Sequence, residues 1–262
     1  MTTWTRSLRV AEAEAIGYRR TWRGTVISSF VTPLMYLGAM GAGLGVLVDS
    51  GGSDLGVDYL PYVATGMIAA TAMQSATGDA TWPVMAGIRH RKTFFATIAT
   101  PVSPEELVYG KLVWGALRLA FILLVFALIG VALGALELGP ALLAVPPGVL
   151  TGLAFLSCIM AYTVTREDEQ ALSSLFRFAI IPLFLFSGTF FPITQLPGFL
   201  QLVAYATPLF HGVELVRKIA LPDVGADVVS SMPIWAHVAY LVVMGVIGTL
   251  LAGRFLDRRL RP

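Results

Sequence analysis

The stretch TVISSFVTPLMYLGAMGAGLGVLV covers residues 25–48 and contains no charged side chain. A helix of about 20 mostly apolar residues is long enough to cross the roughly 30 Å hydrocarbon core of a bilayer. The stretch is also longer than the apolar core of a cleavable signal peptide, which has roughly 7–15 residues. It therefore predicts a membrane-spanning helix that remains in the protein.

Five further apolar runs follow along the chain, near residues 61–82, 113–134, 141–164, 176–191 and 234–255. The fifth run is the shortest, and Pro182 and Pro192 interrupt it. The chain is 56% hydrophobic, its mean hydropathy is +0.76, and only 13% of its residues are charged. Soluble domains typically have about 25% charged residues. We expect an all-α membrane protein with six transmembrane helices.

The basic residues indicate the orientation of these helices. If the six runs cross the membrane in alternation, sixteen of the 18 Lys and Arg residues fall on one side, and only Arg217 and Lys218 fall on the other. The loop at 49–60 contains three aspartates and no basic residue. Because loops rich in Lys and Arg stay in the cytoplasm, we expect a multi-pass protein of the plasma (inner) membrane with both termini in the cytoplasm.

Residues 1–24 form a separate unit ahead of the six-span domain, which covers residues 25–262. Their apolar residues recur in steps of three and four and share one helical face, and most of the arginines fall elsewhere. These apolar positions are Trp4, Leu8, Ala11, Ala15, Tyr18 and Trp22. The pattern predicts an amphipathic helix over residues 2–24 that lies on the membrane surface. A helix that packs on a soluble partner is the alternative.

A cytoplasmic stretch, residues 83–112, joins the second and third spans. Ser103, Pro104 and the two following glutamates form a helix start, with a capping side chain, a proline at the first position and acids in the first turn. One short helix is expected ahead of this start, within residues 84–100. Such a segment can dock into a groove of a partner protein, or it can be a solvated loop.

Residues 192–233, between the last two spans, are too apolar for a solvated loop. Pro197 and Pro208 divide them into pieces of about 8–14 residues, which are too short to cross a bilayer. We expect a re-entrant helical segment that enters the membrane from outside. Glu214 and Arg217 are three positions apart, so they can form a pair on one helical face.

Asp79 lies near the cytoplasmic end of the second span. An ionisable group within a span is a functional candidate, although this one is close to the membrane surface. It can reach interfacial water or pair with Arg89 or Arg91. We favour a structural role for this intramembrane carboxylate.

The sequence contains no motif for catalysis or ATP binding. Its only Gly-Lys dipeptide, at residues 110–111, is followed by Leu112 and lacks the first glycine of a Walker sequence, so the chain cannot hold ATP phosphates in that manner. The single cysteine, Cys158, excludes an internal disulfide, and the three histidines show no metal-ligand spacing. We expect no enzyme activity, no bound cofactor or metal, and no nucleic-acid partner.

Three parts of the sequence resemble the type-2 ABC exporter permeases, the ABC-2 family, and within it the branch of nodulation protein J and the daunorubicin permeases. They are GIRHRK (87–92) with ATPVSPEELVYGK (99–111), FSGTFFPI (186–193) and PLFHGVELVR (208–217). Together with the number of spans and the amphipathic start, the resemblance covers nearly the whole chain. This sequence departs from the family pattern at Phe210, where many relatives have threonine. The resemblance therefore does not identify the substrate.

This resemblance implies a half-transporter. Two permease subunits, identical or paralogous, would pair in the lipid bilayer and bind two copies of an ABC ATPase that holds ATP and Mg²⁺. The residues expected at the interface that couples to the ATPase are Arg89, Arg91, Lys92, Pro101, Glu105 and Glu106. The first and fifth spans would line a path for a glycan, a glycolipid or a hydrophobic drug-like molecule. The aromatic candidates for this path are Phe184, Phe186, Phe190 and Phe191.

Two other classes of protein compete with this interpretation. A secondary transporter or channel that works without ATP would favour buried charges near the midplane or an inverted repeat. A membrane-embedded enzyme, such as a lipid transferase, would need a cluster of catalytic polar residues. The sequence shows none of these features, so we expect ATP-driven export.

Overall fold

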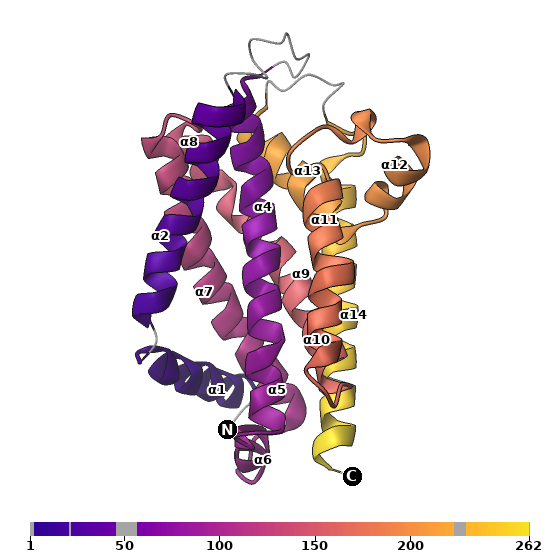
Figure 1. The fold of residues 1–262 in the computed structure, drawn as a ribbon. Helices are drawn as coiled ribbons and strands as arrows, with labels where there is room; N and C mark the ends of the chain where they lie inside the picture. Colours follow the sequence, from indigo (N-terminus) through magenta and orange to yellow (C-terminus); the bar gives the residue numbers. More distant parts are fainter. Residues whose placement is uncertain (1–2, 21, 46–56, 223–228, 262) are drawn as a thin grey trace.

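The computed structural model describes residues 3–20, 22–45, 57–222 and 229–261. Within these ranges the chain is helical and contains no β-strand. Figure 1 shows long helices side by side, with the start of α1 (Thr3–Tyr18) and the end of α14 (Ile234–Leu260) at the same end of the bundle. The all-α prediction is confirmed for the described part of the chain.

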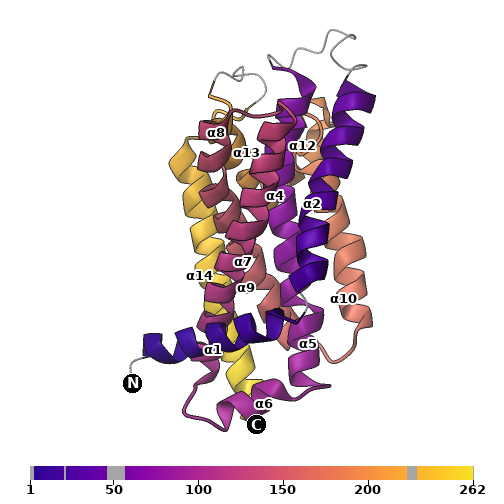
Figure 2. The ribbon, with the colours of Figure 1, turned by 90° about the vertical axis from the view of Figure 1, so that its left-hand side faces the viewer.

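A set of helical columns runs along the long axis of the bundle (Figures 1 and 2). They are α2 (Trp22–Gly38) with a π-helical continuation (Ala39–Gly45), α4 (Tyr59–Ala80), α7 (Pro104–Ala132), α9 (Val145–Val164), α14, and a column made of α10 (Gln170–Leu175), a π-helical turn (Phe176–Ile180) and α11 (Ile181–Phe186). Shorter elements lie at the two ends. They are α1, α5 (Trp82–Ile88) and α6 (Thr93–Ile98) at one end, and α8 (Leu138–Leu143), α12 (Gly198–Tyr205) and α13 (Pro208–Ala220) at the other.

Three helical segments in the described residues are long and apolar enough to cross a membrane by length and composition. They are Pro104–Ala132, Leu138–Val164 and Ile234–Leu260, and they coincide with three of the six expected spans. The helices α12 and α13 meet at 81° and would make a fourth crossing only if the bent pair counted as one span. Their bend and shortness agree with the re-entrant segment expected between the last two spans.

The helix α4 occupies the second expected span and lies inside the bundle. Fifteen of its 22 residues are buried, and it packs against α7, α9 and α13. A helix surrounded by other helices needs small side chains for close packing more than it needs strongly apolar ones. At Gly66 a Cβ would lie only 2.5 Å from the carbonyl oxygen of Thr189, so the chain after α11 packs directly on the α4 backbone.

The fifth column begins and ends earlier than expected. Helical structure runs from Gln170 to Phe186 and stops before the turn at Gly188, which has a φ of +83°. Residues 187–191 were expected inside the fifth span but lie outside the helix. Pro182 does not break the column, because the wider π-helical turn before it accommodates the missing backbone N–H.

The first column starts at Trp22, so the interfacial helix expected over residues 2–24 is shorter and ends at Tyr18. Residues 46–48 of the expected first span lie outside the described residues, as do most of the expected outer loop at 49–60 and residues 223–228 of the re-entrant segment.

Candidate functional site

The helix α1 lies across the columns at one end of the bundle and packs on α7 (Figure 2). Its buried residues are Ser7, Val10 and Ala11. Trp4 and Leu8 were expected on the same face as Ala11, but they are exposed at 62% and 42%. The apolar residues of α1 therefore do not all share one environment. The buried ones pack against α7, and the exposed ones remain free to contact the membrane surface.

Gly110 allows α1 to approach α7 closely. A Cβ at this position would lie 2.4 Å from Val10 Cβ and 2.6 Å from the carbonyl oxygen of Ser7, so any other residue would push the helices apart. Polar and aromatic contacts flank this point along α7. They are an ion pair between Lys111 Nζ and Glu14 Oε1 (2.7 Å), one between Arg6 Nη1 and Glu106 Oε1 (3.6 Å), and an edge-on contact of the Tyr18 and Trp114 rings (5.4 Å).

We expect Gly110→Val to lift α1 from α7, because overpacking at a close contact costs about 1–3 kcal/mol. A cysteine at Ser7, which is 1% exposed, reports this movement in a Cys158→Ser background. Maleimide labelling should be slow in the parent and fast in the Gly110→Val variant. Gly139→Val is the control, since a Cβ there has no neighbour within 4 Å. Equal labelling of the parent and Gly110→Val would contradict the close contact.

The segment between α4 and α7 contains two short helices, α5 and α6, instead of the single helix expected within residues 84–100. Lys92 lies between them with a φ of +51°, a left-handed conformation that redirects the chain. Phe94 of α6 is buried against α5, where a Cβ at Gly87 would lie 2.6 Å from its ring. The two helices therefore form one packed unit.

The residues expected at the coupling interface divide into two groups. Arg89, Arg91, Lys92, Pro101 and Glu105 are exposed. They lie on or beside α5, α6 and the start of α7, at the end of the bundle where α1 lies (Figure 2). The charges of the three basic residues and of Glu105 are available to a partner protein.

Glu106 behaves differently, because it is only 3% exposed. Its Oε2 accepts a hydrogen bond from Ser103 N over 2.8 Å, and its own N donates to Ser103 Oγ over 3.2 Å. This reciprocal capping box confirms the predicted helix start at Ser103. Glu106 was expected at the coupling interface, but its side chain is buried and instead holds the start of α7 and, through the ion pair with Arg6, the helix α1.

A cleft of about 1040 Å³ lies between α1, α5, α6 and α7. Its aromatic lining residues are Tyr18, Trp82, Phe94 and Trp114, and its charged ones are Arg9, Glu14, Asp79, Arg91, Lys111 and Arg118. Four cations and two anions give the lining a net positive charge. This volume is at the upper end of the roughly 300–1,000 Å³ of small-molecule sites, so the cleft can receive an amphiphile or a segment of a partner protein.

Asp79 forms its ion pair with Arg118 of α7, and not with Arg89 or Arg91 as the sequence suggested. The pairing arises because α4 packs beside α7, which brings Arg118 level with Asp79. The two side chains are 20% and 23% exposed and lie at the inner end of the cleft. The Arg118 cation thus balances the charge of the carboxylate within the bundle, and a structural role for Asp79 stays a prediction.

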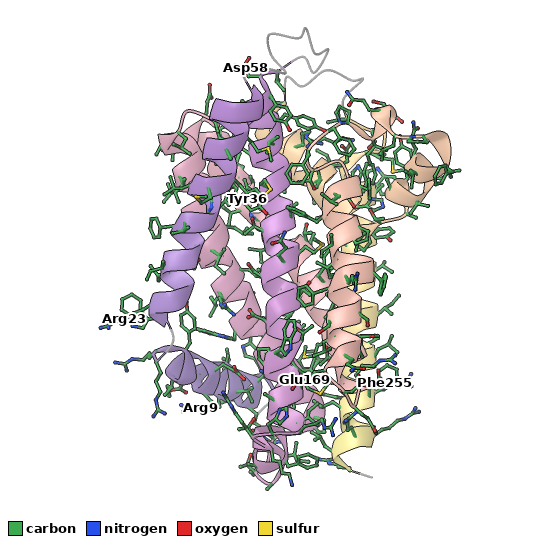
Figure 3. The ribbon with its side chains drawn as sticks, viewed as in Figure 1. Arg9, Arg23, Tyr36, Asp58, Glu169 and Phe255 are labelled. Atoms are coloured by element: carbon green, nitrogen blue, oxygen red, sulfur yellow. The ribbon has the colours of Figure 1, made fainter. Side chains whose placement is uncertain are left out.

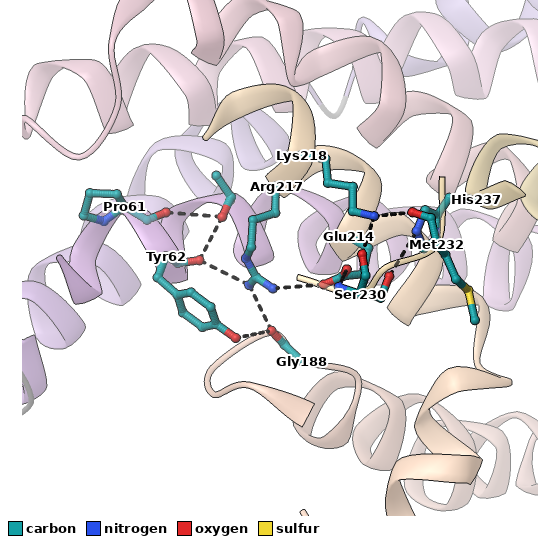
Figure 4. A network of polar contacts seen from close by, with 10 residues as sticks. Pro61, Tyr62, Gly188, Glu214, Arg217, Lys218, Ser230, Met232 and His237 are labelled. Atoms are coloured by element: carbon teal, nitrogen blue, oxygen red, sulfur yellow. Dashed lines mark hydrogen bonds and ion pairs between the residues drawn. The ribbon is translucent and has the colours of Figure 1, made fainter. Parts of the chain in front are cut away.

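The helix α13 lies at the opposite end of the bundle (Figure 1), and Figure 4 shows the buried polar network around it. Arg217 Nη1 is 3.6 Å from Glu214 Oε1, and Arg217 Nη2 donates to the carbonyl oxygen of Gly188 over 2.9 Å. The guanidinium also lies 3.8 Å from the ring centroid of Tyr62, and Glu214 Oε2 accepts a hydrogen bond from Ser230 N. The sequence indicated the pair, but it gave no sign of the other three partners, which are distant along the chain.

Two histidines also meet at this end. His211 Nδ1 of α13 lies 2.9 Å from His237 Nδ1 of α14, and the Tyr240 ring stacks on His211. Sequence spacing gave no signal for this contact, because the two residues belong to separate helices. Within the described ranges, no group of three His, Cys, Asp or Glu side chains could hold a metal ion.

The four phenylalanines expected along a transport path do not share one surface. Phe184 and Phe190 pack edge to face with ring centroids 5.0 Å apart, and Phe184 also contacts Tyr36 of α2. Phe191 packs in the small core under α12, and Phe186 is exposed. The role of these four rings in a transport path stays a prediction. Among them, Phe186 is the most accessible to a molecule outside the subunit.

The family described as ABC-2 type transporter matches residues 8–221, which include the coupling residues, all of the cleft lining and the Glu214–Arg217 pair. The chain belongs to the ABC-2 type transporter family. This permease is therefore a multi-pass membrane protein without an ATPase site of its own, and permeases of this family pair with an ABC ATPase.

Curated relatives match the permease nearly from end to end. Nodulation protein J from Rhizobium meliloti (strain 1021) is 30% identical over 247 residues, which cover 94% of this chain and 91% of the relative. Nodulation protein J from Rhizobium leguminosarum bv. trifolii is 31% identical over 245 residues, which cover 94% and 90%. These similarities confirm the resemblance that the sequence motifs indicated.

Proposed function

We propose that this permease is the membrane-spanning subunit of an ATP-driven exporter. Two permease subunits, identical or paralogous, pair in the membrane and bind two copies of an ABC ATPase, which holds ATP and Mg²⁺. The observation that carries the proposal is the exposed basic turn at residues 89–92, between α5 and α6, in a family without its own ATPase site. This turn offers the ATPase a charged point of contact.

The contacts around Lys111 support a route from this turn to the membrane columns. Lys111 Nζ lies 5.2 Å from the ring centroid of Phe94 in α6 and donates to Glu14 of α1. The Lys111 side chain of α7 thus contacts both α6 and α1. A push of the ATPase on α5 and α6 is passed to α7, a single helix of 29 residues that reaches the other end of the bundle.

For the cargo, the proposal is an amphiphile with a sugar part, such as an acylated oligosaccharide, exported from the cytoplasm or the inner leaflet. The similarity to nodulation protein J favours this glycolipid class over a hydrophobic drug-like molecule. The rings of Phe178 and Phe186 are exposed, and α2 also carries exposed apolar side chains, so both columns offer surfaces on which sugar or acyl groups can pack.

Co-purification with an ABC ATPase tests the proposed assembly. A candidate ABC ATPase from the same genome would be co-expressed with the permease, and the detergent-solubilised complex would be analysed for its mass and its ATPase activity. A complex of two permeases and two ATPases is expected. A permease that purifies alone, with an ATPase equally active in its absence, would contradict the proposal.

We further propose that α2, α4 and the α10–α11 column also cross the membrane, which gives six spans with α1 on the cytoplasmic side. The distribution of basic residues supports this orientation. Figure 3 labels Arg9 and Arg23 near the end where α1 lies and Asp58 at the opposite end.

Cysteine labelling of intact cells is expected to show this orientation. In a Cys158→Ser background, Asp58→Cys should react with a membrane-impermeant maleimide from outside, and Arg91→Cys should react only after the cells are opened. Both positions are exposed. Asp54, in the same expected outer loop, lies outside the described residues but should behave as Asp58 does. Labelling of position 58 only from the cytoplasm would overturn the orientation.

A further inference from the structure

A small apolar slot lies where α1 turns into α2, against α7. Its volume is about 300 Å³, and it is lined by Trp22 and Val26 of α2, by Trp114 and Phe121 of α7, and by Tyr18 and Arg118. This is the lower limit of the roughly 300–1,000 Å³ of small-molecule sites. Apart from Arg118 and the Tyr18 hydroxyl, the named lining is apolar or aromatic, so the slot fits a hydrocarbon chain.

The slot continues into the charged cleft between α1, α5, α6 and α7. Tyr18, Trp114 and Arg118 line both spaces. The Arg118 guanidinium is held at this junction by its ion pair with Asp79, and it lies 5.6 Å from the Tyr18 ring centroid. A ligand that fills both spaces therefore has an apolar part and a polar part joined near Arg118.

The outer rim of the slot is exposed on the surface of the subunit. Leu117 and Phe121 are 61% and 44% exposed, and the exposed row continues along α7 through Leu124 and Leu128. Exposed apolar side chains on a long helix of a membrane protein contact lipid. Acyl chains can thus reach the slot from the side without entering a path through the protein.

The tryptophans place the slot at the membrane surface. Four of the five in the chain lie at this end: Trp4 on α1, Trp22 and Trp114 in the slot lining, and Trp82 in the cleft lining, whereas Trp235 lies at the start of α14. Tryptophan is enriched where the headgroups meet the hydrocarbon. The junction at Arg118 is therefore at the depth where the headgroup of a lipid joins its acyl chains.

The charges of the cleft indicate which kind of lipid headgroup it would bind. Lys111 is paired with Glu14 and Arg118 with Asp79, whereas Arg91 forms no ion pair with any described residue. The remaining lining charge is Arg9, whose partner Glu12 is not part of the lining. This net positive charge favours an anionic headgroup over a zwitterionic one.

We propose that the slot and the cleft together bind one anionic phospholipid of the adjoining leaflet, with an acyl chain in the slot and the phosphate in the cleft. The site lies within one subunit and joins α1, α2 and α7. It does not depend on the identity of the cargo, and Arg91 is the one residue that it shares with the turn proposed to contact the ATPase.

Photolabelling tests this site directly. The permease would be placed in nanodiscs of phosphatidylcholine that contain a small fraction of phosphatidylglycerol with a diazirine in its acyl chain, and labelled peptides would be mapped by mass spectrometry. Labels are expected on residues 18–26 and 114–121. Val26→Trp should reduce this labelling roughly tenfold, the loss expected if about two methylene groups are displaced. Leu128→Trp, an exposed position on the same helix, should leave it unchanged.

The headgroup is tested separately, in variants whose folding is checked by size-exclusion chromatography. Arg91→Gln changes only an exposed side chain and should lower the labelling by phosphatidylglycerol relative to a matched phosphatidylcholine probe. Equal labelling of the parent by the two probes would overturn the anionic site. Displacement of the probe by dodecyl maltotrioside would show a glycolipid site instead, which also overturns the proposal. Unchanged labelling in a folded Val26→Trp variant would exclude the slot.

Discussion

Replacing Arg217 with methionine should lower the stability of the folded permease by about 3–5 kcal/mol, because one partner of a buried ion pair then remains without the other. The side chains of Arg217 and Glu214 are 1% and 4% exposed and lie 3.6 Å apart. The change also removes the charged donor of the Gly188 carbonyl and the cation on the Tyr62 ring. In a chain of this size, the melting temperature should fall by roughly 6–20 °C.

A double variant separates the unpaired charge from the other contacts. With Glu214→Gln added to Arg217→Met, no lone charge remains, and the glutamine oxygen can still accept from Ser230 N. Much of the lost stability and export should return, so each single change should be worse than the two combined. The measurements are the melting temperature in detergent and the export rate per folded permease.

The matched control is Arg261→Met. Its pair with Asp257 has side chains that are 57% and 52% exposed, and exposed pairs contribute at most about 1 kcal/mol. If the effects of Glu214→Gln and Arg217→Met simply add, the two residues do not act as a pair, and one of them would then be free to meet the cargo.

Charge reversal in the exposed turn should have the second large effect. A variant with Arg89→Glu, Arg91→Glu and Lys92→Glu is expected to reduce transport-coupled ATPase activity roughly tenfold or more, since each reversed charge replaces an attraction by a repulsion at the docking surface. The melting temperature should stay within a few degrees of the parent, because surface substitutions usually change stability by less than about 0.5 kcal/mol.

Two controls accompany this experiment. Arg89→Lys with Arg91→Lys keeps the charge and should keep the coupling. Glu105→Lys tests the exposed acid at the start of α7, whereas a change at Glu106 would disturb the capping box and cannot report on docking alone. Full coupling in the folded triple variant would show that the turn is a solvated loop.

The elements that the sequence predicted well are those decided by local pattern. The long apolar helices α7, α9 and α14 follow from hydropathy, and the start of α7 follows from Ser103 and the glutamate three positions later. The break between α12 and α13 follows from proline at position 208. In each case, the residues that decide the structure lie within one or two helical turns of one another.

The features that the sequence did not predict depend on which columns are neighbours. Asp79 pairs with Arg118, 39 positions away, only because α4 packs beside α7. The contact of His211 with His237 likewise depends on how α13 meets α14. The fifth column ends early because its last residues turn to pack on the α4 backbone at Gly66, a contact between distant parts of the chain.

Transport by purified components tests the central claim most directly. The permease would be reconstituted in proteoliposomes with and without its ABC ATPase, and the movement of a fluorescent acylated oligosaccharide across the bilayer would be followed. We predict movement only when ATP, Mg²⁺ and a hydrolysis-competent ATPase are all present. Movement without the ATPase, driven by an ion gradient or by the gradient of the oligosaccharide itself, would contradict the account.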